Sequence, residues 1–108
     1  MPYIVLAEKD REIDRRELNG AIVIGRAQDC DLSVRDILLS RHHCAIEPFG
    51  SYWVIADLGS KNGTWLNGHR ITRHVLAEGE VLRMGKTLLC FRSGAFIPAP
   101  PRETKVPS

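Results

Sequence analysis

Three short polar segments of this chain carry residue types suited to binding a doubly charged anion. They are Gly25-Arg26, the segment from Ser40 to His43, and the segment from Gly59 to Thr64. Together they supply two guanidinium groups, an ammonium group, a hydroxyl and a carboxamide, and their glycines let backbone N–H groups approach a ligand. No carboxylate occurs in any of the three segments. The set therefore indicates phosphate binding through charge-assisted hydrogen bonds rather than bond-breaking chemistry.

Two other kinds of chemistry are disfavoured by what surrounds these residues. Ser40 and His43 could form a nucleophile–base pair, but neither an acid nor a G-x-S-x-G motif accompanies them. The cysteine and histidine positions also lack the spacing of a zinc site; they are Cys30, Cys44, Cys90, His42, His43, His69 and His74. We therefore expect a protein that is not an enzyme and that carries no metal and no cofactor.

The polar segments interrupt a series of short apolar runs that are typical of β-strands. Asn67-Gly68 marks the clearest hairpin, because both residues tolerate the positive φ of a tight turn. Asp14 to Glu17 is so highly charged that a strand there must be exposed or lie at an edge. The predicted strands are Tyr3–Leu6, Ala21–Ile24, Leu32–Val34, Cys44–Ile46, Tyr52–Ala56, Thr64–Leu66, His69–Ile71, Val81–Met84 and Thr87–Phe91. With no helical periodicity, the pattern predicts an all-β sandwich or barrel.

The length of 108 residues fits one domain, which we place at residues 1–95. Residues 96–108 are rich in proline and polar residues and are expected to form a flexible tail or linker. An odd number of cysteines, three, without a Cys-x-x-Cys pair favours a reduced, intracellular protein. Met1 to Leu6 lacks the charged region of a signal peptide, and no segment is long enough to span a membrane. We expect a cytoplasmic protein with no membrane partner.

In their order and spacing, the polar segments resemble a forkhead-associated (FHA) domain. The resemblance covers about Ile22 to Phe91 and includes Gly25-Arg26, Ser40 to His43, Asp57 to Thr64 and Asn67-Gly68. It implies a β-sandwich of about eleven strands with binding loops at one end. It also implies binding to a phosphothreonine in an extended peptide, and hence partners that are substrates of Ser/Thr kinases.

The resemblance assigns roles to particular residues. It implies that Arg26, Ser40 and Arg41 contact the phosphate, that Lys61 lies beside it, and that Asn62 bonds the main chain of the peptide. Structural support of the site is expected from Gly25, His43, Gly63, Asn67 and Gly68. A phosphothreonine carries nearly two negative charges and three strong acceptor oxygens, which suits these donors.

In relatives, the loop before Ser40 helps to read the third residue after the phosphothreonine. Leu38-Leu39 lies in that loop here, so an apolar residue or little preference is expected; alternatively, both leucines belong to the core.

Two other functions remain open from the sequence. An FHA-like module could bind a partner without phosphate. A basic β-barrel could bind single-stranded nucleic acid, but the net charge of only +2 and the absence of aromatic residues from the three polar segments argue against that function.

Overall fold

The computed structural model describes residues 1–94. The predicted tail at 96–108 lies outside the described residues. Eleven strands make up the described part; they are β1 (Tyr3–Glu8), β2 (Arg11–Glu17), β3 (Ile22–Gly25), β4 (Leu32–Ser33), β5 (Cys44–Phe49), β6 (Tyr52–Asp57), β7 (Thr64–Leu66), β8 (His69–Ile71), β9 (Arg73–Val75), β10 (Val81–Met84) and β11 (Thr87–Arg92). Nowhere in these residues does a helix occur that could cross a membrane.

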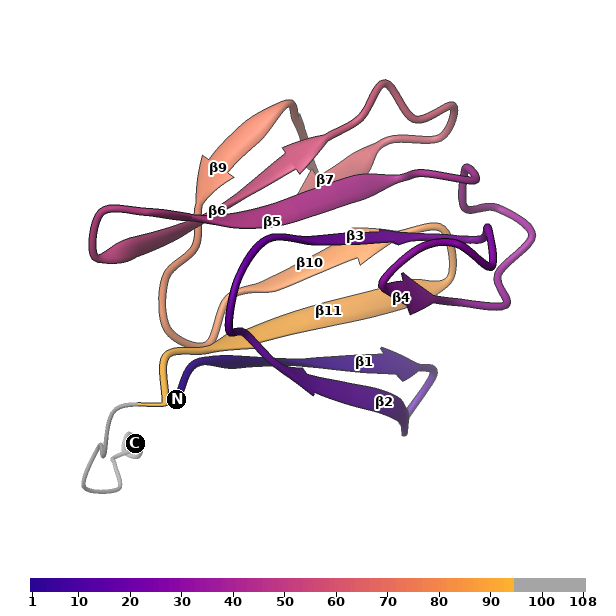
Figure 1. The fold of residues 1–108 in the computed structure, drawn as a ribbon. Helices are drawn as coiled ribbons and strands as arrows, with labels where there is room; N and C mark the ends of the chain where they lie inside the picture. The colour runs from indigo at the N-terminus through magenta and orange to yellow at the C-terminus, as the bar shows by residue number, and fades with distance from the viewer. Residues whose placement is uncertain (95–108) are drawn as a thin grey trace, which may run out of the picture.

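The strands form two sheets, which confirms the predicted β-sandwich (Figure 1). A six-stranded sheet has the order β2-β1-β11-β10-β7-β8, and a five-stranded sheet has the order β4-β3-β5-β6-β9. Neighbouring strands are antiparallel except β3 and β4, which pair in parallel. The core lies between the sheets, where apolar side chains alternate inward from both. Its fully buried members include Ile4, Leu6, Ile24, Leu32, Ile46, Ile55, Leu82 and Leu89.

The edges of the sheets show what the sequence pattern did and did not reveal. β2 is the charged edge strand that was expected, and nearly all of its residues are exposed. β9 was not predicted from the sequence. Its three residues, Arg73, His74 and Val75, have no apolar run, and they become a strand by pairing with β6 at the sheet edge.

The connections between strands place the polar segments together. The β3–β4, β4–β5 and β6–β7 connections all lie at the right-hand end of the sandwich in Figure 1, with the turn between β10 and β11. The N-terminus and the β5–β6 turn lie at the opposite end. Rigid strands therefore present three loops, well separated in sequence, on one end of the molecule.

Candidate functional site

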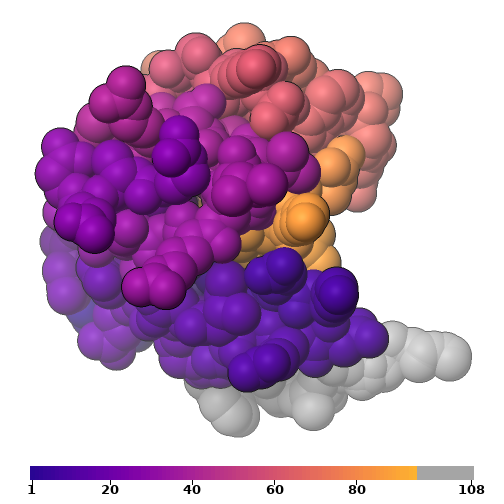
Figure 2. Space-filling model, turned by 90° about the vertical axis from the view of Figure 1, so that its right-hand side faces the viewer, coloured from indigo at the N-terminus to yellow at the C-terminus, as the bar shows by residue number. Residues whose placement is uncertain are grey.

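A polar cavity lies at this loop end of the sandwich, the end that faces the viewer in Figure 2. Its volume is about 340 Å³. The eight residues that line it are Arg26, Ile37, Leu38, Leu39, Ser40, Arg41, Lys61 and Asn62. The structure thus brings together all five residues that the resemblance assigned to peptide binding. The lining residues include no acidic side chain, so a dianion entering the cavity meets donors and cations.

Arg26 and Arg41 are positioned by a close contact between two backbone segments. The Arg26 N–H donates to the Ser40 carbonyl at 3.0 Å, and the Ala27 N–H donates to the Arg41 carbonyl at 3.0 Å. Gly25 permits this approach, because a Cβ at that position would lie 2.1 Å from the Arg41 carbonyl oxygen. The Arg26 side chain is exposed, and its Nε donates to the Leu39 carbonyl at 3.1 Å. That bond orients the guanidinium group along the cavity wall.

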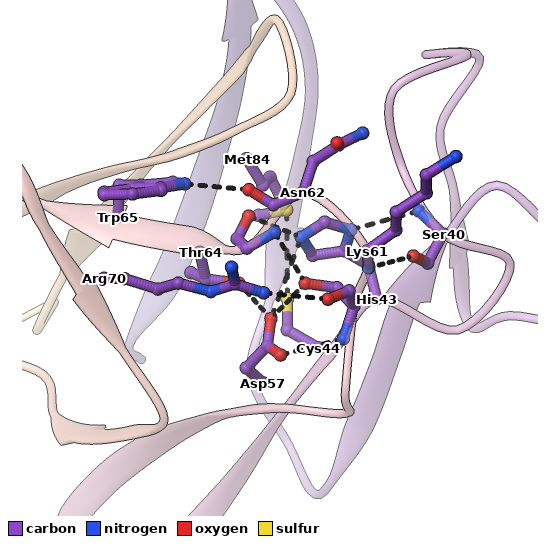
Figure 3. Close-up of polar contacts among 12 residues, drawn as sticks. Ser40, His43, Cys44, Asp57, Lys61, Asn62, Thr64, Trp65, Arg70 and Met84 are labelled. Atoms are coloured by element: carbon purple, nitrogen blue, oxygen red, sulfur yellow. Dashed lines mark hydrogen bonds and ion pairs between the residues drawn. The ribbon is translucent and has the colours of Figure 1, made fainter.

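Ser40 has a hydroxyl that is ready to donate. Its Oγ accepts a hydrogen bond from the Lys61 backbone N–H at 3.0 Å (Figure 3). A hydroxyl that accepts one bond still has its own proton to donate, so the Ser40 O–H is available to a ligand oxygen. The same contact holds Lys61, whose side chain is exposed at the cavity rim, close to Ser40.

His43 links Ser40 of the β4–β5 connection to Gly63 of the β6–β7 loop. The side chain is fully buried, and its Nδ1 accepts a bond from the Ser40 N–H at 3.1 Å. Its Nε2 lies 3.0 Å from the Gly63 carbonyl oxygen. These two partners fix the neutral tautomer with the proton on Nε2, which donates to Gly63. His43 therefore supports the loops and does not line the cavity.

A network around Asp57 shapes the β6–β7 loop, and sequence reasoning gave it no role (Figure 3). One carboxylate oxygen accepts from the Ser60 hydroxyl at 2.6 Å and from the Thr64 hydroxyl at 2.8 Å. The other accepts from the Ser60 N–H at 2.9 Å. Burial would raise the pKa of Asp57, but the hydrogen bonds from Ser60 and Thr64 outweigh it and hold that pKa below its usual value. The signal in the sequence was an Asp followed three residues later by Ser, a pattern that favours such local turns.

Asn62 lies exposed at the tip of the same loop. Its side-chain Nδ2 donates to the Leu38 backbone carbonyl at 2.8 Å. Its backbone carbonyl accepts from the Trp65 indole N–H at 2.9 Å. Gly63 follows with a φ of +87°, and a Cβ there would lie 2.7 Å from the Arg70 Nε. Arg70 donates to the Ser60 carbonyl at 2.9 Å. Asn62 is therefore held by Leu38 of the β4–β5 connection and by Trp65 of β7, while Gly63 allows the tight packing beneath it.

Asn67 and Gly68 lie in the turn between β7 and β8, and neither lines the cavity. Their φ values of 51° and 80° confirm the expected tight hairpin. The turn sets the register that pairs Trp65 with Arg70, the two side chains that hold the β6–β7 loop.

The two leucines of Leu38-Leu39 face different ways in the apolar part of the cavity. Leu39 is 1% exposed and belongs to the core, whereas Leu38 is 39% exposed and lines the cavity. The alternative in which both leucines are buried is therefore wrong. Sequence reasoning also missed Ile37, which is 83% exposed beside them. An apolar residue in a surface loop with no periodic pattern gives no sign of which way it faces.

Comparisons with known proteins agree with this arrangement. The family model of the FHA domain matches residues 22–85. FHA domain-containing protein FhaB of Mycolicibacterium smegmatis is 40% identical over 75 residues, which are 68% of this chain and 48% of that protein. The ABC transporter ATP-binding/permease protein Rv1747 of Mycobacterium tuberculosis is 40% identical over 77 residues, which are 71% of this chain and 9% of that protein. The chain thus spans less than half the length of these relatives.

Solved structures show the same architecture. The FhaA FHA domain, in complex with the intracellular domain of Rv3910, superposes with a TM-score of 0.72 at 33% identity, over 85% of this chain and 100% of that one. Mycobacterium tuberculosis EmbR, in complex with a low-affinity phosphopeptide, superposes with a TM-score of 0.76 at 28% identity, over 90% of this chain and 26% of that one. FHA domains are binding modules rather than enzymes. With a family model that covers more than half of its residues, this chain belongs to the FHA domain family.

Proposed function

We propose that this domain binds a phosphothreonine in an extended segment of another protein and so assembles partners after phosphorylation by a Ser/Thr kinase. The observation that carries the proposal is the donor set of the cavity. Arg26 reaches it from the β3–β4 connection, and Ser40 and Arg41 reach it from the β4–β5 connection. Lys61 and Asn62 reach it from the β6–β7 loop. Each guanidinium group can bind two phosphate oxygens, and Ser40 adds a neutral donor.

Asn62 suits the peptide main chain. A carboxamide can donate and accept at once, which matches the paired N–H and C=O of a peptide unit. In the free domain the Asn62 amide donates to the Leu38 carbonyl, a bond that an incoming peptide can replace. Binding then exchanges one hydrogen bond for another. Together with the small size of the cavity, this exchange predicts modest affinity and rapid release.

Three further observations bear on the phosphothreonine ligand, the cellular setting and the alternative of nucleic-acid binding. One solved structure with a TM-score of 0.74 at 30% identity comes from an analysis of phosphothreonine-dependent FHA domain interactions. The three cysteines are all free, which supports a reducing, cytoplasmic setting. Aromatic residues with high exposure, Phe49 and Tyr52, lie on the β5–β6 hairpin and not in the cavity. This placement gives no support to base stacking in the cavity by single-stranded nucleic acid.

The test is calorimetry with one peptide in four forms: phosphothreonine, phosphoserine, glutamate and unphosphorylated threonine. We expect measurable binding of the phosphothreonine form, weaker binding of the phosphoserine form, and no binding of the other two. The threonine methyl group contributes about 0.8 kcal/mol if it is buried in an apolar recess.

Arg26→Ala should abolish binding, since a hydrogen bond to a charged group contributes about 1.5–3 kcal/mol. Arg15→Ala is the matched control, because Arg15 is an exposed arginine of β2 and does not line the cavity. Equal binding of the unphosphorylated peptide would show a module that works without phosphate. Normal phosphopeptide binding by a folded Arg26→Ala protein would refute the assignment of the cavity.

A further inference from the structure

A second group of polar side chains lies beside the proposed phosphate site. Asp29 and Cys30 belong to the β3–β4 connection, and His42 belongs to the β4–β5 connection. One ligand atom from each residue lies within 4.8 Å of the other two. The Nε2 of His42 lies 3.1 Å and 3.3 Å from the two carboxylate oxygens of Asp29. We propose that Asp29, Cys30 and His42 form a binding site for a divalent cation of the zinc class.

The ligand types select the class of ion. Zinc accepts thiolate sulfur, imidazole nitrogen and carboxylate oxygen, with bond lengths of about 2.3, 2.0–2.1 and 2.0–2.2 Å. Calcium and magnesium prefer sites built from oxygen alone. Tetrahedral ligands at the zinc bond lengths lie about 3.3–3.6 Å apart. The His42–Asp29 pair is already close to this spacing.

The cluster combines one fixed ligand with two adjustable ones. Cys30 is 8% exposed, and its backbone N–H donates to the Ala27 carbonyl at 3.2 Å. The side chains of Asp29 and His42 are 74% and 51% exposed, so both can turn toward the sulfur without disturbing the core. Three protein ligands leave the fourth position of a zinc ion to water.

Charge also favours the ion. Asp29 supplies a carboxylate, which attracts a dication. On binding, the thiol proton passes to the solvent, and a dication with one thiolate and one carboxylate is neutral. Asp31 adds a second carboxylate next to Cys30 in the chain.

The proposed cation site is coupled to the proposed phosphate site through one atom, the Arg41 carbonyl oxygen. The Cys30 thiol donates to the Arg41 carbonyl at 3.1 Å, and the Ala27 N–H donates to the same oxygen. When Cys30 binds the ion as a thiolate, it can no longer donate to the Arg41 carbonyl. The hydrogen bond from the Ala27 N–H still holds the Arg41 backbone. Spacing along the sequence did not suggest this site, because His42 lies 12 positions from Cys30 and the third ligand is an aspartate.

The experiment titrates the reduced protein with Co²⁺, which reports thiolate ligation through a charge-transfer band, and then displaces it with Zn²⁺. We expect one equivalent of each ion and loss of the cobalt spectrum on zinc addition. Cys30→Ser, whose hydroxyl can still donate to the Arg41 carbonyl, should abolish the charge-transfer band. Asp29→Asn and His42→Gln should each weaken zinc binding about tenfold or more, because even residues that only support metal ligands have effects of that size.

A double variant, Cys90→Ser with His69→Gln, is the matched control, since it removes the same two residue types outside the cluster and should bind like the wild type. Circular dichroism checks that each variant is folded; if Cys30→Ser is not, the exposed positions Asp29 and His42 decide the question by zinc calorimetry. No charge-transfer band in the wild type up to millimolar ion would overturn the proposal. So would a band that persists in folded Cys30→Ser, or zinc binding that is unchanged in both Asp29→Asn and His42→Gln.

Discussion

Ser40 is fixed at two points before any ligand arrives. Its backbone N–H donates to His43, and its Oγ accepts from the Lys61 N–H. The hydroxyl proton is the part of Ser40 that remains free to turn toward a phosphate oxygen. A donor held in this way loses little conformational freedom on binding, so more of the interaction energy appears as affinity.

His43→Ala should weaken both folding and peptide binding. The change leaves the Ser40 N–H and the Gly63 carbonyl without their partner, and each buried unsatisfied group costs about 1–3 kcal/mol. Urea unfolding measures the loss of stability, and calorimetry measures the loss of affinity. Arg26→Ala is the comparison, because it should lose binding with little change in unfolding. If His43→Ala unfolded like the wild type but no longer bound peptide, His43 would be a direct ligand instead of a support.

Ile37 and Leu38 should make the domain prefer an apolar residue on the C-terminal side of the phosphothreonine. Both are exposed and line the cavity, so an apolar peptide side chain that covers them gains about 25 cal/mol per Å² of buried surface. An oriented phosphopeptide library measures the preference. Leu38→Lys should shift it toward Asp and Glu by about 0.2–1 kcal/mol. Val81→Lys, an exposed position on β10, should leave it unchanged.

An acidic preference in the wild-type domain would contradict this prediction. Arg73 and His74 could not readily explain it, because they lie on β9 and line a different cavity, next to Phe49 and Val54.

Most strands could be predicted because their residues carry their own signal. β3 and β11 are apolar runs bounded by turn residues, and Asn67-Gly68 fixes a hairpin by itself. β9 and the Asp57 network could not be predicted in the same way. A charged three-residue strand forms only because β6 offers it an edge, and the bonds of Asp57 exist only after the β6–β7 loop has closed.

That Arg26, Ser40, Arg41, Lys61 and Asn62 line one cavity could be predicted because the order and spacing of three short segments resemble an FHA domain. The exposure of Ile37 and the meeting of Asp29 with His42 depend on how separate loops pack, and no local pattern encodes that.

The end of β3 offers a direct test of how tightly two loops must approach. Gly25→Ala should destabilise the domain and reduce peptide affinity, because the new Cβ would collide with the Arg41 carbonyl oxygen and push the Arg41 segment away from β3. Gly20→Ala is the matched control, since nothing lies within 4 Å of a Cβ at that position. Thermal unfolding and calorimetry on both variants measure the effects. A Gly25→Ala protein that matches Gly20→Ala in both measurements would show that the close approach is not required.

Asp36 is a buried carboxylate that joins the two sheets at the loop end. Asp36 follows β4 of the five-stranded sheet, and its Oδ2 accepts from the Lys86 N–H at 2.7 Å and from the Thr87 hydroxyl at 2.9 Å, at the turn into β11 of the other sheet. Its Oδ1 accepts from the Leu38 N–H at 3.0 Å. Asp36 thus connects the packing of the whole sandwich to the position of the cavity wall.

This arrangement predicts how the whole molecule responds to acid. Burial alone would raise the pKa of Asp36, but hydrogen bonds from Leu38, Lys86 and Thr87 lower it below its usual value, and the pKa of Asp57 is lowered in the same way. A lowered pKa means that the unfolded state binds more protons in the range below about pH 4. The stabilisation is therefore complete above that range and is lost as the pH falls through the folded-state pKa values. The free energy of unfolding, measured in urea, should fall steeply below about pH 4.

Asp36→Asn should be less stable than the wild type at neutral pH. The side-chain NH₂ of the asparagine would lie opposite the Leu38 N–H, so two donors would meet without an acceptor. Its stability should also fall less steeply in acid, since one of the titrating carboxylates is gone. Asp10→Asn, in the exposed turn between β1 and β2, should follow the wild-type curve, because that side chain meets water in both states. If the Asp36→Asn curve ran parallel to the wild-type curve down to the acid limit, the carboxylate of Asp36 would not be the group that links proton binding to the joining of the two sheets.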